Sequence, residues 1–225
     1  MPAKPSGPLR EDPTLDEVRA YLAPQLASQA AFDGWNEQAV FAAAEQANID
    51  PEIAGLAFNA GPVDMIDAWF DSIDGKMAET YSDDQLAKMK IRERITALVV
   101  ARLEILEADR EGLRRALAIL AMPPNIPLAA KLGWRAADKM WRRAGDTATD
   151  YNHYTKRTLL SAVYGSTISV FLDDDSDGYA QTKAFLDRRI ENVMQFEKVK
   201  AKITRPKGDR FSMARFIGRL RYRGA

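Results

Sequence analysis

Helix punctuation recurs along the chain and limits the fold more than any other feature of the sequence. Short polar residues stand where helices begin, as in Asp50-Pro51 and at Ser82, and Gly34 and Gly61 separate one apolar segment from the next. The alternation of apolar and polar residues that is typical of strands does not occur. We therefore predict an all-α fold.

The spacing of these signals predicts the following helices: residues 12–31, with Asp12 as N-cap before Pro13, then 36–47, 51–59, 62–73, 82–107, 109–121, 126–144, 149–172 and 176–202. The acidic run 173–178 is predicted to be a turn that caps the next helix. We predict three parts: an N-terminal segment with the first helix (1–33), a helical domain (34–202), and a linker with a basic helix (203–225).

Charge is distributed unevenly, although 32 basic and 32 acidic residues cancel. Between Tyr21 and Gly75 there is no Lys or Arg, and nine acidic residues give this block a net charge of −9. From Lys198 to Ala225, ten basic residues and one acidic residue give a net charge of +9. This asymmetry predicts that the two ends of the chain meet different partners.

The residue inventory argues against most kinds of catalytic and metal site. There is no cysteine, and the single histidine, His153, cannot supply the paired Glu-x-x-His motifs of a di-iron bundle. The acidic turn begins like a calcium loop, but its twelfth position is Ala184 instead of a bidentate Glu. No nucleophile elbow, P-loop or dinucleotide fingerprint occurs. We predict a protein that is not an enzyme and has no cofactor. An enzyme that acts on a lipid substrate is the third hypothesis, after the two that the motifs described below suggest.

The termini predict a location. No run of about 18 apolar residues occurs, and the first residues lack the apolar core of a signal peptide. In the basic tail, four apolar residues at helical spacing form one stripe flanked by four arginines, a pattern typical of an interfacial membrane helix. These predicted membrane-binding residues are Arg210, Met213, Phe216, Ile217, Arg219, Leu220, Arg221 and Arg223. We expect a cytoplasmic protein of bacterial type, peripheral on the inner membrane; docking of the tail on its own domain is the alternative.

Residues 36–75 have helix-turn-helix rhythm and resemble the N-terminal part of tetracycline-repressor-type regulators. A ligand-sensing transcriptional regulator is therefore the second hypothesis. A recognition helix needs basic residues to approach phosphates, whereas this one carries Asp50 and Glu52. The sequence thus predicts the repressor-like fold without nucleic-acid binding.

Several longer motifs resemble the coenzyme Q (ubiquinone) biosynthesis protein nine family. They are GWNEQAVFAAAEQANID (34–50), KIRERITALVVARLEIL (90–106), LGWRAADKMWRRAGDTATD (132–150), GDTATDYNHYTKR (145–157) and FLDRRIENVMQFEK (185–198). The likeness runs from about Gly34 to Lys202. One residue departs from the pattern, since the family usually has Trp at the position of His153.

The resemblance implies a homodimeric, lipid-binding accessory protein on a membrane surface. Such a protein presents prenylated quinone intermediates to a partner, the di-iron demethoxyubiquinone hydroxylase. The implied partner-binding residues are Asp146, Asp150, Tyr151, Asn152, His153, Tyr154, Lys156 and Arg157.

Further along the same helix, an apolar face is predicted to line the lipid cavity. It consists of Leu159, Leu160, Val163, Tyr164, Thr167, Ile168 and Phe171. For each of these residues, ordinary core packing is an equally good interpretation.

Overall fold

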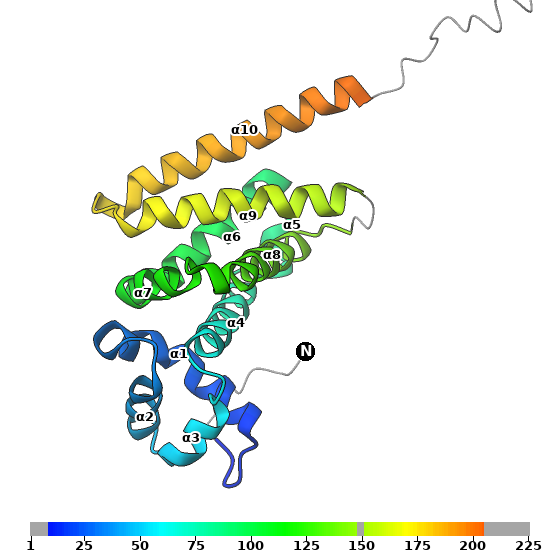
Figure 1. Cartoon of the computed structure of the whole chain (residues 1–225). Coiled ribbons are helices and arrows are strands. Elements are labelled where there is room, and N and C mark those ends of the chain that lie inside the picture. The colour runs from blue at the N-terminus through cyan, green and yellow to red at the C-terminus, as the bar shows by residue number, and fades with distance from the viewer. Residues whose placement is uncertain (1–8, 148–150, 205–225) are drawn as a thin grey trace, which may run out of the picture. The chain divides into compact units, whose positions relative to one another are not determined.

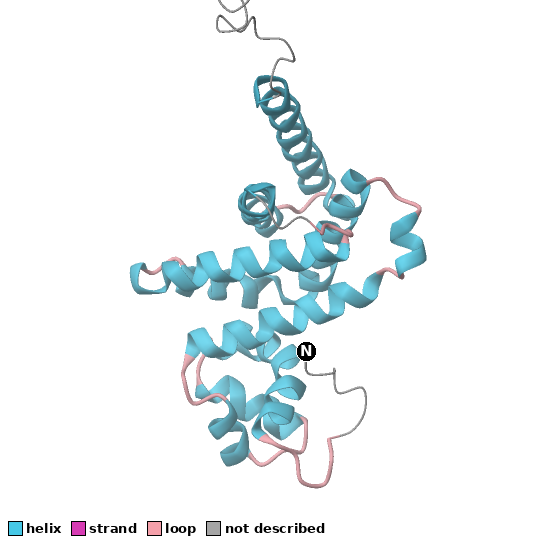
Figure 2. Ribbon diagram, turned by 90° about the vertical axis from the view of Figure 1, so that its right-hand side faces the viewer, coloured by secondary structure: helices cyan, strands magenta, loops and turns pink. Residues whose placement is uncertain are grey.

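The computed structural model describes residues 9–147 and 151–204, and every regular element within these ranges is a helix (Figures 1 and 2). The α-helices are α1 (Leu15–Asp33), α2 (Glu37–Gln46), α3 (Pro51–Ala57), α4 (Pro62–Thr80), α5 (Asp83–Ala87), α6 (Ile91–Leu106), α7 (Arg110–Leu120), α8 (Ile126–Arg143), α9 (Tyr151–Leu172) and α10 (Ala180–Thr204). Short 3-10 helices are η1 (Glu107–Asp109), η2 (Pro123–Asn125) and η3 (Asp177–Tyr179). The predicted all-α class is confirmed.

Contacts divide the chain into two units, residues 1–190 and 191–225. Of the second unit, the structure describes residues 191–204, which form the C-terminal half of α10. The buried residues that form the hydrophobic core lie in the first unit.

The first helix begins two residues later than Pro13, where the sequence predicted it. Thr14 is the N-cap, and it forms a capping box with Glu17. The Thr14 amide donates to Glu17 Oε2 at 2.9 Å, and the Glu17 amide donates to Thr14 Oγ1 at 3.3 Å. This reciprocal pair satisfies two amides that a helix start leaves unpaired, so Thr14 replaces the predicted Asp12 as the cap.

The long helix predicted at 82–107 is wrong, because two helices, α5 and α6, occupy this stretch. Arg94 Nε donates to the Met89 carbonyl at 3.0 Å, which a continuous helix would use for its own ladder. The Lys90 amide donates to Glu93 Oε2 at 2.7 Å and opens α6. The side chains of Glu93 and Arg94 thus satisfy the backbone groups at the break, and the helix ends and restarts here although the apolar stripe is continuous.

Other boundaries moved as well. Helix α4 continues to Thr80, seven residues past the predicted end at 73. The predicted helix at 176–202 begins with η3, where Gly178 has a φ of 57°, and becomes α-helical only at Ala180. A left-handed residue ends one hydrogen-bond ladder before the next begins, and glycine adopts it without strain.

Helix α1 lies at the centre of the N-terminal half, where it contacts α2, α3, α4 and α7 (Figure 1). It approaches α7 very closely at Gly112, where a Cβ atom would lie 2.3 Å from the Ala27 carbonyl oxygen. The buried Trp35 indole donates to the Gly112 carbonyl at 3.0 Å. Helix α4 leads from this half to α6 and α8, and α8 packs along α9.

Candidate functional site

Helices α8 and α9 are joined by a cluster of ion pairs around Arg157. This side chain is 1% exposed, and its Nε lies 2.6 Å from Asp138 Oδ1 while its Nη1 lies 3.0 Å from Asp146 Oδ2. Lys156 Nζ also lies 2.6 Å from Asp146 Oδ1. Arg157 therefore holds α9 to α8 through Asp138, and Arg157 and Lys156 together hold α9 to Asp146 in the segment that follows α8. The Arg157 guanidinium does not reach the surface.

The same contacts set the protonation of the two carboxylates. Burial alone would raise the pKa of Asp146, but hydrogen bonds from Lys156 and Arg157 outweigh burial and lower it. Burial likewise opposes the lowered pKa of Asp138, which results from hydrogen bonds donated by Arg157 and Arg142. Both groups therefore remain ionised in the folded protein at neutral pH.

An aromatic patch lies beside this cluster and is formed by Trp134 of α8 with His153 and Tyr154 of α9. The ring centroid of Trp134 lies 6.4 Å from that of His153 and 6.0 Å from that of Tyr154. The ring centroids of His153 and Tyr154 are 5.2 Å apart. Tyr154 is 61% exposed, whereas the other two are half-buried. The structure thus places the rings of His153 and Tyr154 beside Trp134 of α8, and the partner-binding role of His153 and Tyr154 stays a prediction. Sequence reasoning did not include Trp134 among the site residues, although it lies in the motif at 132–150, because no local pattern shows which turn of α8 faces α9.

Other predicted residues are described in part or not at all. Asp150 lies outside the described residues, as do the side chains of Tyr151 and Asn152, whose backbone forms the first turn of α9. The predicted membrane-binding residues also lie outside the described ranges: Arg210, Met213, Phe216, Ile217, Arg219, Leu220, Arg221 and Arg223.

The apolar face of α9 turns toward the interior of the first unit, where α9 contacts α6 and α8. Leu159 is half-buried, and the other predicted lipid-binding residues are buried: Leu160, Val163, Tyr164, Thr167, Ile168 and Phe171. The structure therefore brings the seven residues together on the inner side of the helix. Their contact with a lipid stays a prediction.

A buried charge cluster underlies this face, and sequence reasoning missed it. Arg102 Nε donates to the Tyr164 hydroxyl at 3.0 Å, and Arg102 Nη1 pairs with Asp74 Oδ1. Asp74 Oδ2 lies 3.2 Å from Arg135 Nε and 3.5 Å from Lys139 Nζ. Burial raises the pKa of the Tyr164 phenol, so this residue is neutral and places a polar hydroxyl within the apolar face.

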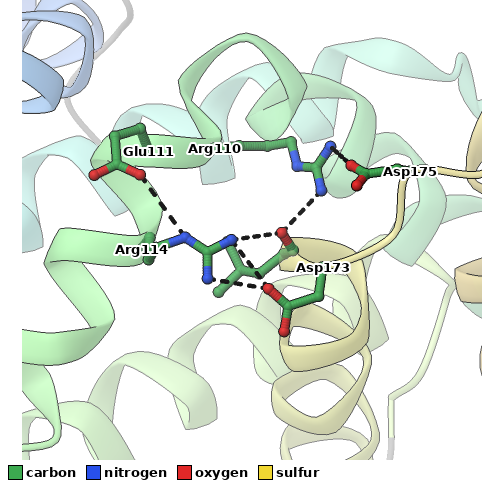
Figure 3. Close-up of a pocket in the computed structure, with 6 residues that line it drawn as sticks. Arg110, Glu111, Arg114, Asp173 and Asp175 are labelled. Atoms are coloured by element: carbon green, nitrogen blue, oxygen red, sulfur yellow. Dashed lines mark hydrogen bonds and ion pairs between the residues drawn. The ribbon is translucent and has the colours of Figure 1, made fainter.

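A polar pocket of about 440 Å³ lies between α7 and the C-terminal end of α9 (Figure 3). Its arginines already have partners: Arg110 Nη2 donates to the Leu172 carbonyl at 2.8 Å, and Arg114 Nη2 donates to the same carbonyl at 2.7 Å and to Asp173 Oδ1 at 3.1 Å. Guanidinium groups satisfy carbonyls that the end of a helix leaves unpaired. Arg110 and Arg114 therefore anchor the turn between α9 and α10 to α7.

The predicted capping role of the acidic turn is confirmed at Asp174. This carboxylate accepts hydrogen bonds from the amides of Ser176, at 2.9 Å, and Thr182, at 2.7 Å, and from both hydroxyls. The hydroxyl and amide donors hold the pKa of Asp174 well below its usual range. Within the described ranges, no group of His, Asp and Glu side chains is arranged to hold a metal ion.

Acid should weaken the fold, because Asp138, Asp146 and Asp174 all have a lower pKa in the folded state than in the unfolded state. Such groups stabilise the protein above their unfolded pKa, near 4, and the stabilisation is lost as pH falls through the folded pKa. We expect the free energy of unfolding, measured with urea, to fall steadily below about pH 4. Asp174→Asn should flatten this slope, and a free energy that is constant from pH 5 to pH 3 would contradict the prediction.

The described residues contain no single helix that is long and apolar enough to cross a bilayer. One pair of segments, Ile91–Leu120 and Pro123–Arg143, meets the length and composition criteria together, but the pair is bent by 94°.

The sequence model of the COQ9 family matches residues 126–197, which include the whole of α8 and α9. The ubiquinone biosynthesis protein COQ9, mitochondrial, of Rattus norvegicus is 30% identical over 168 residues, 72% of this chain and 54% of that protein. The chain belongs to the COQ9 family. The corresponding proteins of Homo sapiens and Drosophila melanogaster are 29% and 26% identical, over 72% and 81% of this chain. The chain spans about half the length of the curated COQ9 proteins it matches.

The fold of this COQ9 family member is that of a repressor. The crystal structure of the TetR transcriptional regulator from Nitrosomonas europaea superimposes with a TM-score of 0.61 and 21% sequence identity. The match covers 79% of this chain and 98% of the regulator. The predicted tetracycline-repressor-like fold is therefore confirmed.

Proposed function

We propose that this COQ9 family member is a non-catalytic accessory protein of ubiquinone biosynthesis. It binds prenylated quinone precursors and presents them to the di-iron demethoxyubiquinone hydroxylase at a membrane surface. The observation that carries the proposal is the match of α8 and α9 to proteins named for ubiquinone biosynthesis. The two faces of α9 give this match a physical basis, since one face is apolar and turned inward and the other carries the aromatic patch.

In this proposal, the inward apolar face of α9 allows the protein to take a prenylated lipid out of a bilayer. A prenyl tail leaves a bilayer only if a protein offers comparable apolar burial, at about 25 cal/mol per Å². In this proposal the tail lies in a cavity among buried residues such as Leu160, Val163 and Ile168, and the quinone head stays near the mouth of that proposed cavity. The hydroxylase supplies the metal and the chemistry. The protein itself is a homodimer, cytoplasmic and peripheral on the inner membrane.

Native mass spectrometry of the purified protein, followed by solvent extraction, tests lipid binding directly. We expect a non-covalent mass that is released by solvent and identified as a prenylated quinone or precursor. Protein that carries no lipid, even after incubation with quinone-containing membranes, would exclude the carrier role.

Deleting the residues after Arg205 should abolish most binding to anionic liposomes and leave the helical fold intact. The deleted segment contains the basic residues of the predicted interfacial helix, each of which contributes about 1 kcal/mol near an anionic surface. Co-sedimentation with liposomes measures the loss, and the circular dichroism spectrum checks the fold. Unchanged co-sedimentation of the truncated protein would remove the tail from the proposal.

A DNA-binding regulator can have this fold, but it needs basic residues near its recognition helix, and this chain lacks them. Helix α3 occupies the position of a recognition helix, and it exposes Glu52, Ile53 and Leu56. No Lys or Arg occurs from residue 22 to residue 75, so this module has no cation to neutralise phosphates. We expect fluorescence anisotropy with labelled duplex DNA to show no salt-sensitive binding. Binding that weakens linearly with the logarithm of salt concentration would favour the regulator instead.

A further inference from the structure

The corner between α7 and α8, residues 121–127, exposes apolar side chains. Met122 is 52% exposed and Ile126 is 55% exposed. The prolines of the corner are exposed as well: Pro123, Pro124 and Pro127. Its one polar side chain, Asn125, is half-buried, and Asn125 Nδ2 donates to the Ile119 carbonyl at 2.8 Å. Loops are normally polar, and a run of exposed apolar residues in one indicates a function.

The backbone of the corner has no amide left to pair. Its three prolines have no N–H group. The other four amides all donate to carbonyls of the corner or of α7: Ala121 to Leu117 at 2.9 Å, Met122 to Ile119 at 3.2 Å, Asn125 to Met122 at 2.8 Å, and Ile126 to Pro123. An amide without a partner is costly in an apolar medium. The corner can therefore leave water without losing a hydrogen bond from its backbone amides.

The corner is also held in one conformation at a sharp change of direction. Proline fixes φ at three of its seven residues, and the Asn125 side chain ties it to the end of α7. The segments Ile91–Leu120 and Pro123–Arg143 meet here at 94°. A preorganised apolar surface loses little conformational entropy when it is buried.

The charge around the corner is positive. No Asp or Glu occurs from residue 112 to residue 137, whereas four basic residues do: Arg114, Arg115, Lys131 and Arg135. The three arginines pair with acidic side chains. Lys131 is exposed, lies five residues after Ile126, and makes no ion pair among the residues that the structure describes. An available cation beside an apolar surface suits the boundary between anionic head groups and acyl chains.

We propose that this corner is a membrane contact: Met122, Ile126 and the prolines enter the apolar boundary of a bilayer, and Lys131 pairs with an anionic head group. The contact goes beyond the proposed function, which assigns membrane binding to the basic tail. A bilayer suits the corner better than a protein partner, because a corner whose amides are all bonded offers no backbone donor to another chain.

A fluorescent label tests insertion directly. The chain has no cysteine, so Met122→Cys gives the full chain a single site for the environment-sensitive fluorophore NBD. Vesicles of phosphatidylcholine and phosphatidylglycerol should shift its emission to the blue, and nitroxide-labelled lipid should quench it. The matched control is Leu56→Cys, at a 59% exposed apolar residue of the acidic N-terminal block, and its label should show neither effect.

Vesicle co-sedimentation measures what the corner contributes to binding. The double change Met122→Ser with Ile126→Ser should lower the partition coefficient about tenfold, since each side chain still has about half of its area to bury. Lys131→Gln should lower it about fivefold on vesicles with phosphatidylglycerol, and little on phosphatidylcholine alone. Ile53→Ser with Leu56→Ser should leave it unchanged. Thermal melts check that each variant is folded.

Three results would overturn the inference, and they can be told apart. If the full chain binds vesicles but the label at residue 122 neither shifts nor is quenched, the corner is not a membrane contact, and membrane binding by the tail stands. If the full chain does not bind vesicles, both are wrong. If the emission shifts with protein concentration in the absence of vesicles, the corner is instead a contact between copies of this chain.

Discussion

Asp74→Asn is expected to lower the free energy of unfolding by about 3–5 kcal/mol, the cost typical of breaking a buried ion pair by removing one partner. Asp74 and Arg102 are each 1% exposed, and they lie on α4 and α6. In the Asp74→Asn variant, the Arg102 guanidinium keeps two acceptors, the Tyr164 hydroxyl and the amide oxygen at position 74, and both are neutral. A buried cation with only neutral partners is not compensated for the water it has lost.

The order of the variants tests this explanation. Arg102→Met should cost less, about 1.5–3 kcal/mol, because Asp74 keeps Arg135 and Lys139 as partners. The control is Asp71→Asn, since this carboxylate is 60% exposed and pairs with Lys139 at 2.9 Å. That change should cost less than about 1 kcal/mol. Urea unfolding followed by circular dichroism measures all three. Equal costs for Asp74→Asn and Asp71→Asn would mean that burial of the pair does not set its contribution.

The double change Asp138→Asn with Asp146→Asn is expected to cost about 3–5 kcal/mol as well, and more than the sum of the single changes. Either single variant leaves the buried Arg157 one carboxylate. The double variant leaves it the His153 carbonyl, 3.2 Å from Nη1, and two neutral amides. Because these pairs hold α8 against α9, the aromatic patch should loosen with them.

A matched change at the same cluster separates burial from charge. Arg142 also pairs with Asp138, at 2.6 Å, but its side chain is 69% exposed. Arg142→Gln should therefore cost less than about 1 kcal/mol. Urea unfolding gives the free energies. Intrinsic fluorescence, measured in a background where Trp35 and Trp69 are replaced by Phe, leaves Trp134 and Trp141 to report on the packing of α8 against α9. Strictly additive single and double costs would contradict the shared role of Arg157.

Helix positions followed from the sequence where the signals are local. Pro51 and Pro62 each stand at the start of a helix, as predicted. The Asp50 side chain caps the first of these helices, and Gly61 occupies the N-cap position of the second. The predicted helix boundaries were wrong where a side chain bonds a nearby backbone group and so ends a helix within a continuous apolar pattern. Arg94, which takes the carbonyl of Met89, is the clearest case. The periodicity of apolar residues shows which face of a helix is buried, but not where the backbone hydrogen bonds of that helix end.

The site shows the same division at longer range. The sequence indicated that His153 and Tyr154 share one helix turn with Lys156 and Arg157, because a helix of 3.6 residues per turn fixes that neighbourhood. It treated Arg157 as a surface residue, since nothing in its local sequence shows that it is buried. The partners of Arg157 lie 19 and 11 residues earlier on the chain.

The amino-acid sequence by itself determined the all-α class, the order of the helices and membership of the COQ9 family, since these depend on periodicity, caps and contiguous motifs. Only the tertiary structure decided which charges are buried and which rings meet. Asp74 pairs with Arg102, which is 28 residues away, and with Arg135, which is on a third helix. The physical reason is that the cost of burying a charge depends on a partner supplied by another helix, and local spacing does not encode how helices pack against one another.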